Sequence, residues 1–147
     1  MTVNYSMAAK RAEYARNAVL SASPARLLTM LYDRLLLDLA RAETAQQNAE
    51  WPVASENLLH AQAIITELMG TLKTDVWEGG ENLHGIYTYS LSTLMNANIG
   101  RDAKLTRECI DLLEPIRLAW HEASAQLPAA GATPAAAGTP GGVLGVG

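Results

Sequence analysis

Several residue types are scarce in this chain, and each scarcity limits what it can be. Phenylalanine is absent and aromatic residues make up 5% of the sequence. The core must therefore consist mainly of leucine, isoleucine, alanine and methionine, most of which favour helices. The one cysteine, Cys109, cannot form an internal disulfide, which fits a reducing compartment and makes the cytoplasm the expected location.

A strong charge of one sign and long apolar runs are also missing. Eleven Lys and Arg residues face fifteen Asp and Glu residues, for a net charge of -4, so no basic field would attract nucleic acid or an anionic membrane. No apolar run reaches the ~20 residues that span a bilayer. Charged residues between Lys10 and Arg16 interrupt the apolar centre that a signal peptide would need. We expect neither a nucleic-acid nor a membrane partner.

Helical spacing dominates the chain between Ser23 and residue 127. Ser23 followed by Pro24 is typical of a helix start, and Asp102 can cap a later helix. Apolar residues repeat every three or four positions in four segments, which begin near residues 24, 52, 83 and 102. The sequence predicts an all-α protein with an antiparallel up-down four-helix bundle over residues 23–127. Residues 1–22 should add a short N-terminal helix or arm, and the Pro/Ala/Gly-rich residues 128–147 a disordered tail.

The first long helix, over about residues 24–49, is apolar nearly all round. One face carries the stripe expected to meet neighbouring helices, whereas four large side chains lie outside it: Met30, Tyr32, Leu36 and Leu37. Something must cover more than one side of this helix. A segment of a partner protein, the N-terminal arm and a second copy in a homodimer all satisfy that requirement.

Polar residues on the apolar faces need partners if they are buried. Asp38 falls close to the stripe of the first long helix, and Asn98 falls on the stripe of the third. We expect Asn98 to form a hydrogen bond across a turn. His60 and His121 stand singly on helices and are expected to be solvated or hydrogen-bonded surface residues.

Groups able to perform catalysis or bind metal do not converge. Glu81 and His84 have the spacing used in metal-binding helical bundles, but only one copy of the motif exists and it lies on the polar side of its helix. Cys109 lies on the apolar stripe of its helix, where a thiol has little reactivity. We predict a protein that is not an enzyme and has no cofactor or metal, with a metal-binding bundle as one alternative. Small secreted helical-hairpin proteins with a Trp-x-Gly turn are the other, because Trp77-Glu78-Gly79 lies between two helices, although four helices are predicted here.

Several uncommon strings occur together along the chain. They are Tyr14-x4-Val19, Ser21-Ala22-Ser23-Pro24-x2-Leu27-Leu28-x-Met30-Leu31-Tyr32-Asp33, His60-Ala61-Gln62-Ala63-Ile64-Ile65-x-Glu67-Leu68, Asn82-Leu83-x2-Ile86-Tyr87-x-Tyr89, Ala97-Asn98 and Trp120. In this order the chain resembles the flagellin-specific export chaperone family (FliS) over roughly residues 10–125. His60 stands where the family often has lysine, Arg34 stands where glycine is common, and the tail has no family counterpart.

This resemblance implies a cytoplasmic bundle that binds the C-terminal segment of newly made flagellin. Such a chaperone prevents premature polymerisation and helps to deliver flagellin to a component of the flagellar type III export gate. Apart from the resemblance, the apolar Tyr14 and Val19 shortly before the Ser23 cap lead us to expect that the N-terminal arm occupies the binding groove when flagellin is absent. The predicted contact residues are Tyr14, Val19, Met30, Tyr32, Leu36, Leu37, Ile64 and Ile86.

Overall fold

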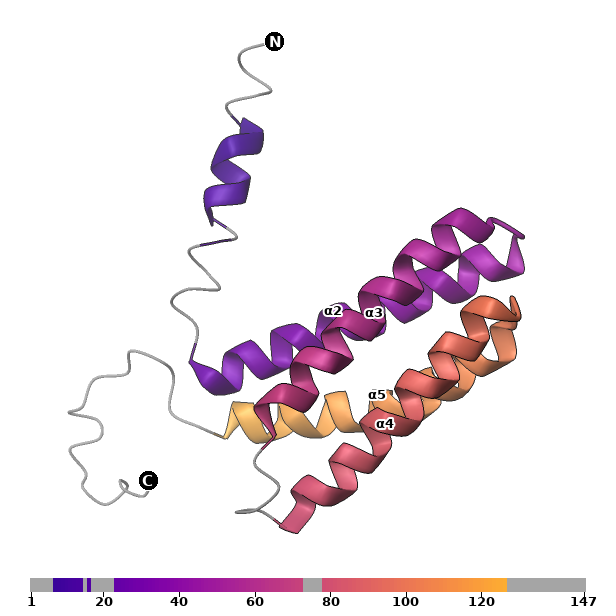
Figure 1. Cartoon of the computed structure of the whole chain (residues 1–147). Helices are drawn as coiled ribbons and strands as arrows, with labels where there is room; N and C mark the ends of the chain where they lie inside the picture. The colour runs from indigo at the N-terminus through magenta and orange to yellow at the C-terminus, as the bar shows by residue number, and fades with distance from the viewer. Residues whose placement is uncertain (1–6, 15, 17–22, 73–77, 127–147) are drawn as a thin grey trace, which may run out of the picture.

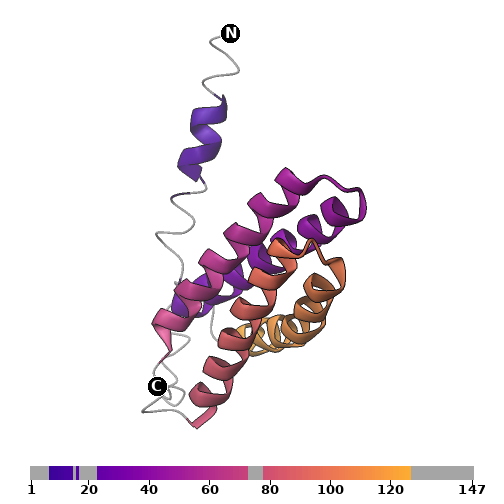
Figure 2. The ribbon, with the colours of Figure 1, turned by 45° about the vertical axis from the view of Figure 1, so that its right-hand side comes forward.

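Four long helices follow one another in the computed structural model, which describes residues 7–14, 16, 23–72 and 78–126. They are α2 (Pro24–Gln47), α3 (Trp51–Thr71), α4 (Glu78–Ile99) and α5 (Ala103–Ala125). Each helix runs antiparallel to the next, and α2 and α4 both pack against α3 and α5 (Figure 1, Figure 2). The predicted all-α, up-down four-helix bundle is therefore confirmed, and the described residues contain no strand.

The predicted additional N-terminal helix is also present. Residues 7–14 are helical, have exposed side chains and stand apart from the bundle (Figure 1, Figure 2). The predicted disordered tail over residues 128–147 lies outside the described residues, as does Trp77 of the Trp-x-Gly turn. The domain boundaries after residues 22 and 127 stay predictions.

Two of the bundle helices begin at the caps that the sequence indicates. The Ser23 side chain accepts a hydrogen bond from the Arg26 backbone N–H at 3.2 Å, and Pro24 occupies the first turn of α2. The Asp102 carboxylate accepts from the Lys104 backbone N–H at 2.9 Å at the start of α5. These bonds satisfy N–H groups that have no partner inside a helix.

Helix α4 begins earlier than predicted. The apolar repeat predicted a start near residue 83, but Glu78, Gly79 and Gly80 form the first turn of α4. Glycine lowers helix stability by about 1 kcal/mol relative to alanine, so local preference argues against this turn. Leu83 and Tyr87 are buried on the same helix one and two turns further on, and their packing outweighs that local cost.

The two tight turns, α2 to α3 and α4 to α5, lie at one end of the bundle, which we call the closed end (Figure 1). Ala49 and Arg101 occupy the left-handed backbone region there, with φ of 57° and 53°. Gln46 joins three helices, because its amide N–H donates to the Ala97 carbonyl at 3.1 Å and its oxygen accepts from the Thr106 hydroxyl at 2.7 Å. At the opposite, open end, α2 begins and α5 ends.

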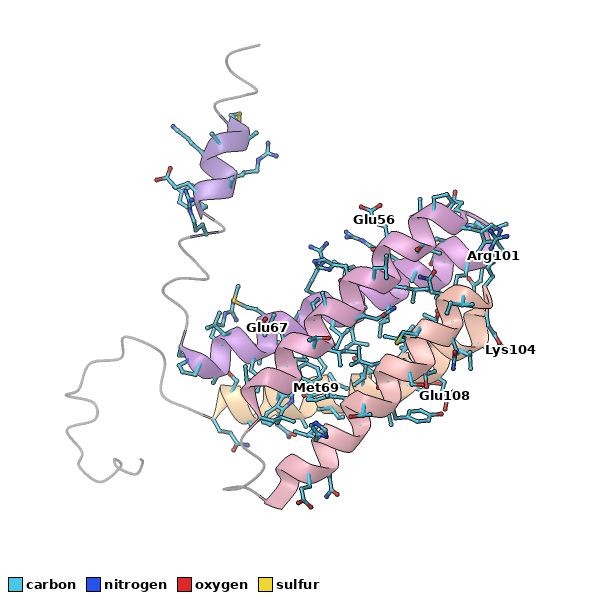
Figure 3. All side chains as sticks on the ribbon, viewed as in Figure 1. Glu56, Glu67, Met69, Arg101, Lys104 and Glu108 are labelled. Carbon is cyan, nitrogen blue, oxygen red and sulfur yellow. The ribbon has the colours of Figure 1, made fainter. Side chains whose placement is uncertain are left out.

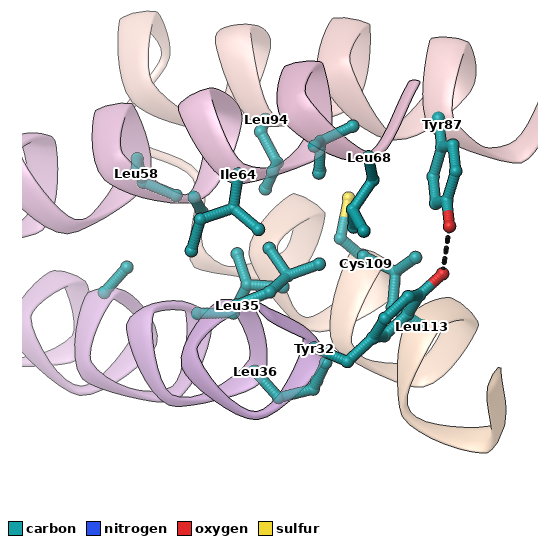
Figure 4. Close-up of a cluster of buried hydrophobic side chains, with 14 of the residues drawn as sticks. Tyr32, Leu35, Leu36, Leu58, Ile64, Leu68, Tyr87, Leu94, Cys109 and Leu113 are labelled. Carbon is teal, nitrogen blue, oxygen red and sulfur yellow. Dashed lines mark hydrogen bonds between the residues drawn. The ribbon is translucent and has the colours of Figure 1, made fainter. Parts of the chain in front are cut away.

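The core is built from aliphatic side chains with few aromatics, as the composition requires (Figure 4). Its fully or almost fully buried members include Leu35, Leu39, Leu58, Ile65, Leu68, Leu94, Cys109 and Leu113. Each well-buried leucine or isoleucine stabilises the fold by about 1.5–3 kcal/mol relative to an exposed one. All four helices contribute, so the bundle has a single shared core.

Candidate functional site

The eight predicted contact residues do not form one surface. Tyr32 is fully buried and Leu36 is 9% exposed, so both belong to the core (Figure 4). The reason is that α2 has two neighbours in the bundle, α3 on one flank and α5 on the other. Side chains outside a single stripe are thereby covered by this chain itself. Tyr32 and Leu36 are therefore core residues that line neither the groove between α2 and α3 nor the groove between α4 and α5, whereas the equally buried Ile64 lines the first.

Met30 and Leu37 lie on the outward side of α2. Leu37 is 42% exposed and Met30 is half-buried. Seven residues separate them, which places them on one helical face together with Asp33. Asp33 pairs with Arg117 and His121 of α5, so this face borders the α2/α5 flank of the bundle.

The remaining predicted contacts are spread over the molecule. Ile64 lines a groove between α2 and α3, whereas Ile86 lines another between α4 and α5. Tyr14 is 76% exposed on the separate N-terminal helix. Val19 lies outside the described residues.

The groove between α2 and α3, which we call the α2/α3 groove, is a concave surface lined mainly by apolar side chains. It has a volume of about 650 Å³ and lies near the open end, beside the first turns of α2. Its lining residues are Pro24, Leu27, Leu28 and Leu31 from α2 and Ala63, Ile64, Glu67 and Thr71 from α3. Glu67 is the only charged residue among them, and Figure 3 labels it on α3 next to α2.

The sequence explains why a groove remains between these helices. Leu27 and Leu31 are four residues apart and place aliphatic walls on the α3 side of α2. The facing positions of α3 include Ala63 and Thr71, whose short side chains leave the space between the helices unfilled. Ile64 is 7% exposed and forms the inner wall.

Sequence reasoning assigned the α2 leucines to the bundle seam and missed their part in the groove. All three leucines, Leu27, Leu28 and Leu31, are only half-buried, so each keeps apolar surface in contact with solvent. The available signal was the pairing of large residues on α2 with small residues such as Ala63 on α3. That signal is readable only once the register of the two helices is known.

His60 lies one turn from Ile64 on α3, and it belongs to a polar cluster that joins α3 to α2 by a hydrogen bond. The Asp38 carboxylate is fully buried and accepts hydrogen bonds from Arg34 Nε at 2.9 Å and from His60 Nδ1. His60 is half-exposed and hydrogen-bonded, in agreement with its expected surface position. A buried carboxylate requires such partners, so this cluster fixes the two walls of the groove relative to each other.

The α2/α5 flank carries a second, more exposed polar cluster. Asp33 Oδ1 accepts from Arg117 Nη1 at 2.9 Å and from His121 Nε2 at 2.6 Å, and Glu114 pairs with the same arginine. Partial burial raises the pKa of Asp33, but the hydrogen bonds from His121 and Arg117 outweigh it and hold that pKa below its usual value. The hydrogen bond from Arg117 likewise lowers the pKa of Glu114.

The groove between α4 and α5 differs from the α2/α3 groove in charge. Its volume is about 640 Å³ and its lining includes two carboxylates, Glu108 and Asp111, beside Ile86 and Leu112. Glu108 accepts a hydrogen bond from the half-exposed Tyr89 hydroxyl. An apolar segment would have to desolvate these carboxylates, so the α2/α3 groove suits such a segment better.

The Asn98 side chain finds its partner on another helix. Its side-chain amide donates to the Ser55 hydroxyl of α3 at 3.2 Å. The expected bond across a turn is formed by the Asn98 backbone carbonyl, which accepts from the Arg101 backbone N–H at 3.3 Å, whereas the side chain bonds to α3. The reason is the register of α3 against α4, which brings Ser55 within reach of Asn98 in the antiparallel pair.

The side chains considered for catalysis or metal binding do not form one site among the described residues. Cys109 is fully buried, and burial raises the pKa of its thiol to about 12, which suppresses the reactive thiolate. Glu81 and His84 are both exposed on α4. Among the described residues, no three His, Cys, Asp or Glu side chains lie close enough together to hold a metal ion. Each described helix is too short or too polar to cross a lipid bilayer.

Comparison with known proteins agrees with the fold and with the sequence strings. The family described as Flagellar protein FliS matches residues 6–127. A flagellar secretion chaperone FliS of Bacillus subtilis is 34% identical, over 75% of this chain and 82% of the relative. Its namesake from Salmonella typhimurium is 34% identical over 74% of this chain and 82% of the relative. A flagellar secretion chaperone FliS of Campylobacter jejuni is 32% identical over 74% of this chain and 86% of the relative.

Proposed function

This chain belongs to the FliS family of flagellar secretion chaperones, a non-enzymatic family, and from that premise we propose that it binds the C-terminal segment of flagellin in the α2/α3 groove. In this proposal the chaperone acts in the cytoplasm, prevents flagellin from polymerising prematurely and assists its delivery to a component of the flagellar type III export apparatus. The single observation that carries the proposal is the apolar, open α2/α3 groove.

The chemistry of the groove supports an amphipathic occupant. Half-buried leucines on α2 and Ile64 on α3 offer aliphatic surface, and Glu67 is the only charge at its edge. An amphipathic helix or extended segment can bury its apolar side chains in such a groove while its polar face stays in water. The volume of about 650 Å³ accommodates several aliphatic side chains but not a folded domain.

The proposed contact set follows from the accessible positions. Of the predicted residues, Ile64 lies in the groove, whereas Met30 and Leu37 lie on the outward face of α2 that borders the α2/α5 flank. Leu27, Leu28 and Leu31 join them. Tyr14, Val19 and Ile86 stay predictions for contacts outside the groove, where a long flagellin segment that wraps around the bundle would meet them.

A substitution in the groove tests the proposal. Ala63 is exposed and lines the groove, so Ala63→Arg should place a long cation in the space without disturbing the core. The matched control is Ala119→Arg at an exposed position on α5 that lies in neither groove. Affinity for a synthetic peptide of the flagellin C-terminus would be measured by calorimetry for the unmodified chain and both variants.

We expect Ala63→Arg to weaken peptide binding by about 10- to 100-fold, because one disrupted anchor in a groove changes binding by roughly 1.4–3 kcal/mol. Ala119→Arg should bind like the unmodified chain. Equal affinities for Ala63→Arg and Ala119→Arg would show that flagellin binds elsewhere. A flagellin lacking its C-terminal segment should fail to co-elute with the chaperone in size-exclusion chromatography, whichever surface is used.

A further inference from the structure

The tail after the bundle has a composition suited to an apolar groove. Residues 128–147 contain no charged side chain, and three aliphatic residues, Val143, Leu144 and Val146, gather in one four-residue stretch. A spacer of proline, alanine, glycine and threonine precedes that stretch. The match to the family ends at residue 127, so the tail lies outside the matched region.

The bundle delivers the tail to the same end as the α2/α3 groove. The His121 side chain of α5 contacts Asp33 of α2 at 2.6 Å, and the rings of Trp120 and Tyr32 are 6.5 Å apart. Because α2 and α5 are antiparallel, the end of α5 lies level with the first turns of α2. Those turns carry Leu27 and Leu28, which line the groove.

The spacer is long enough to reach the groove around α2. Roughly sixteen residues separate Gln126 from Val143, and a flexible chain of that length has a root-mean-square end-to-end distance of about 20–25 Å. The path crosses one helix, whose diameter with side chains is about 10–12 Å. A tether that matches its span presents the tethered segment at an effective concentration of the order of millimolar.

Charge distinguishes the tail from the N-terminal helix as the occupant. The N-terminal segment carries Lys10, Arg11, Glu13 and Arg16, and docking it in an apolar groove would remove several of these charges from water. The tail has no such charges to desolvate. In the structure, residues 7–14 stand apart from the bundle with exposed side chains.

We propose that residues 143–146 bind the α2/α3 groove of their own chain and compete there with flagellin. Occupancy of the groove is argued from the groove and the tail alone, whereas competition rests on the proposed function. Three aliphatic side chains give a weak contact, because ordering the tail offsets much of what their burial contributes. A weak cover suits a chaperone, since it shields apolar surface from aggregation and yields to flagellin.

Paramagnetic relaxation enhancement measures the occupancy directly in the full chain. A nitroxide label on Thr139→Cys would report on the position of the tail, and the buried, high-pKa thiol of Cys109 should stay unlabelled. We expect the amide signals of Leu28 and Ala63 to broaden, and those of Gly85 and Leu112 in the α4/α5 groove to stay sharp. Adding Val143→Asp and Leu144→Asp should restore the Leu28 and Ala63 signals, whereas the matched pair Ala135→Asp and Ala136→Asp should not.

Affinity for the flagellin peptide supplies the second readout. The unlabelled Val143→Asp/Leu144→Asp variant should bind the peptide about two- to tenfold more tightly than the unlabelled Ala135→Asp/Ala136→Asp control. The reason is that the substitutions remove the tail segment as a competitor, which is present near millimolar effective concentration. Both double variants change only the tail. No core residue of the bundle is substituted, so its folding should be unaffected.

The outcomes separate the two proposals. Three results would each overturn the assignment of the tail to its own groove. They are the absence of broadening specific to the α2/α3 groove, broadening in the α4/α5 groove, and broadening that arises only from a label on a second chain, measured in mixtures of labelled and unlabelled chains. Groove broadening with unchanged peptide affinity would uphold the occupancy but overturn the competition, and would place flagellin elsewhere. Groove broadening together with tighter binding by the Val143→Asp/Leu144→Asp variant supports the full inference.

Discussion

The hydroxyl groups of Tyr32 and Tyr87 are hydrogen-bonded to each other in the core, and so join α2 to α4 across the diagonal of the bundle (Figure 4). Burial raises the pKa of both hydroxyl groups. The two residues therefore stay neutral, and each hydroxyl is a hydrogen-bond partner of the other. The bond lies towards the open end, where α2 also contributes the wall of the α2/α3 groove.

Removal of one hydroxyl from this pair should destabilise the bundle more than removal of both. Tyr87→Phe leaves the buried Tyr32 hydroxyl without its partner, which costs about 1–3 kcal/mol, whereas the double variant with Tyr32→Phe leaves no unpaired group. Urea unfolding of the two single variants and the double variant gives the coupling energy. Additive losses in the double variant would contradict the mutual dependence of the two hydroxyls.

The buried Asp38 carboxylate should depend on its two half-exposed partners. Arg34→Ala combined with His60→Ala leaves a buried charge unpaired, and we expect a loss of about 3–5 kcal/mol in unfolding free energy. Asp111→Ala is the control, because its pair with Arg107 joins two exposed side chains and should contribute at most about 1 kcal/mol. If the double variant lost no more than the control, the Asp38 cluster would not be a determinant of stability.

The α2/α5 flank should weaken in acid. Hydrogen bonds lower the pKa of Asp33 and Glu114 in the folded chain from ordinary values of 3.8 and 4.5. Their stabilisation is therefore present above those ordinary values and is lost as pH falls through the lower folded pKa, below about pH 4. Both side chains are partly exposed to water, so we expect only about 0.2–1 kcal/mol from each. Unfolding free energies from pH 6 to 3 should fall less steeply for Asp33→Asn than for the unmodified chain, and parallel curves would argue against this pair.

The Cys109 thiol should be protected in the folded chain. Its pKa of about 12, against an ordinary value of 9.0, lowers the thiolate fraction at pH 8 by about a thousandfold, and burial also excludes the reagent. Reaction with a disulfide reagent at pH 8 should be slow in buffer and fast in denaturant. Ala40→Cys at an exposed position of α2 provides the control, which should react at once in the folded state. Rapid native reaction of Cys109 itself would mean that the core opens frequently.

The sequence by itself determined the helices and most of their ends. Ser23 with Pro24 and Asp102 specify helix starts by satisfying backbone N–H groups locally, and these signals need no tertiary contact. The three- and four-residue spacing also placed Leu58, Leu68 and Cys109 on buried faces. Together with the family strings, this information was enough for the fold and for the chaperone family.

Tertiary structure alone decided which apolar residues stay accessible. Periodicity gives the direction in which Tyr32 or Leu36 points from its own helix, but not how many neighbours surround that helix. Because α3 and α5 both flank α2, those two side chains are covered, while Leu27 and Leu31 face a gap left by the small Ala63. The groove depends on the register between two helices, so the sequence pattern of either helix alone cannot predict it.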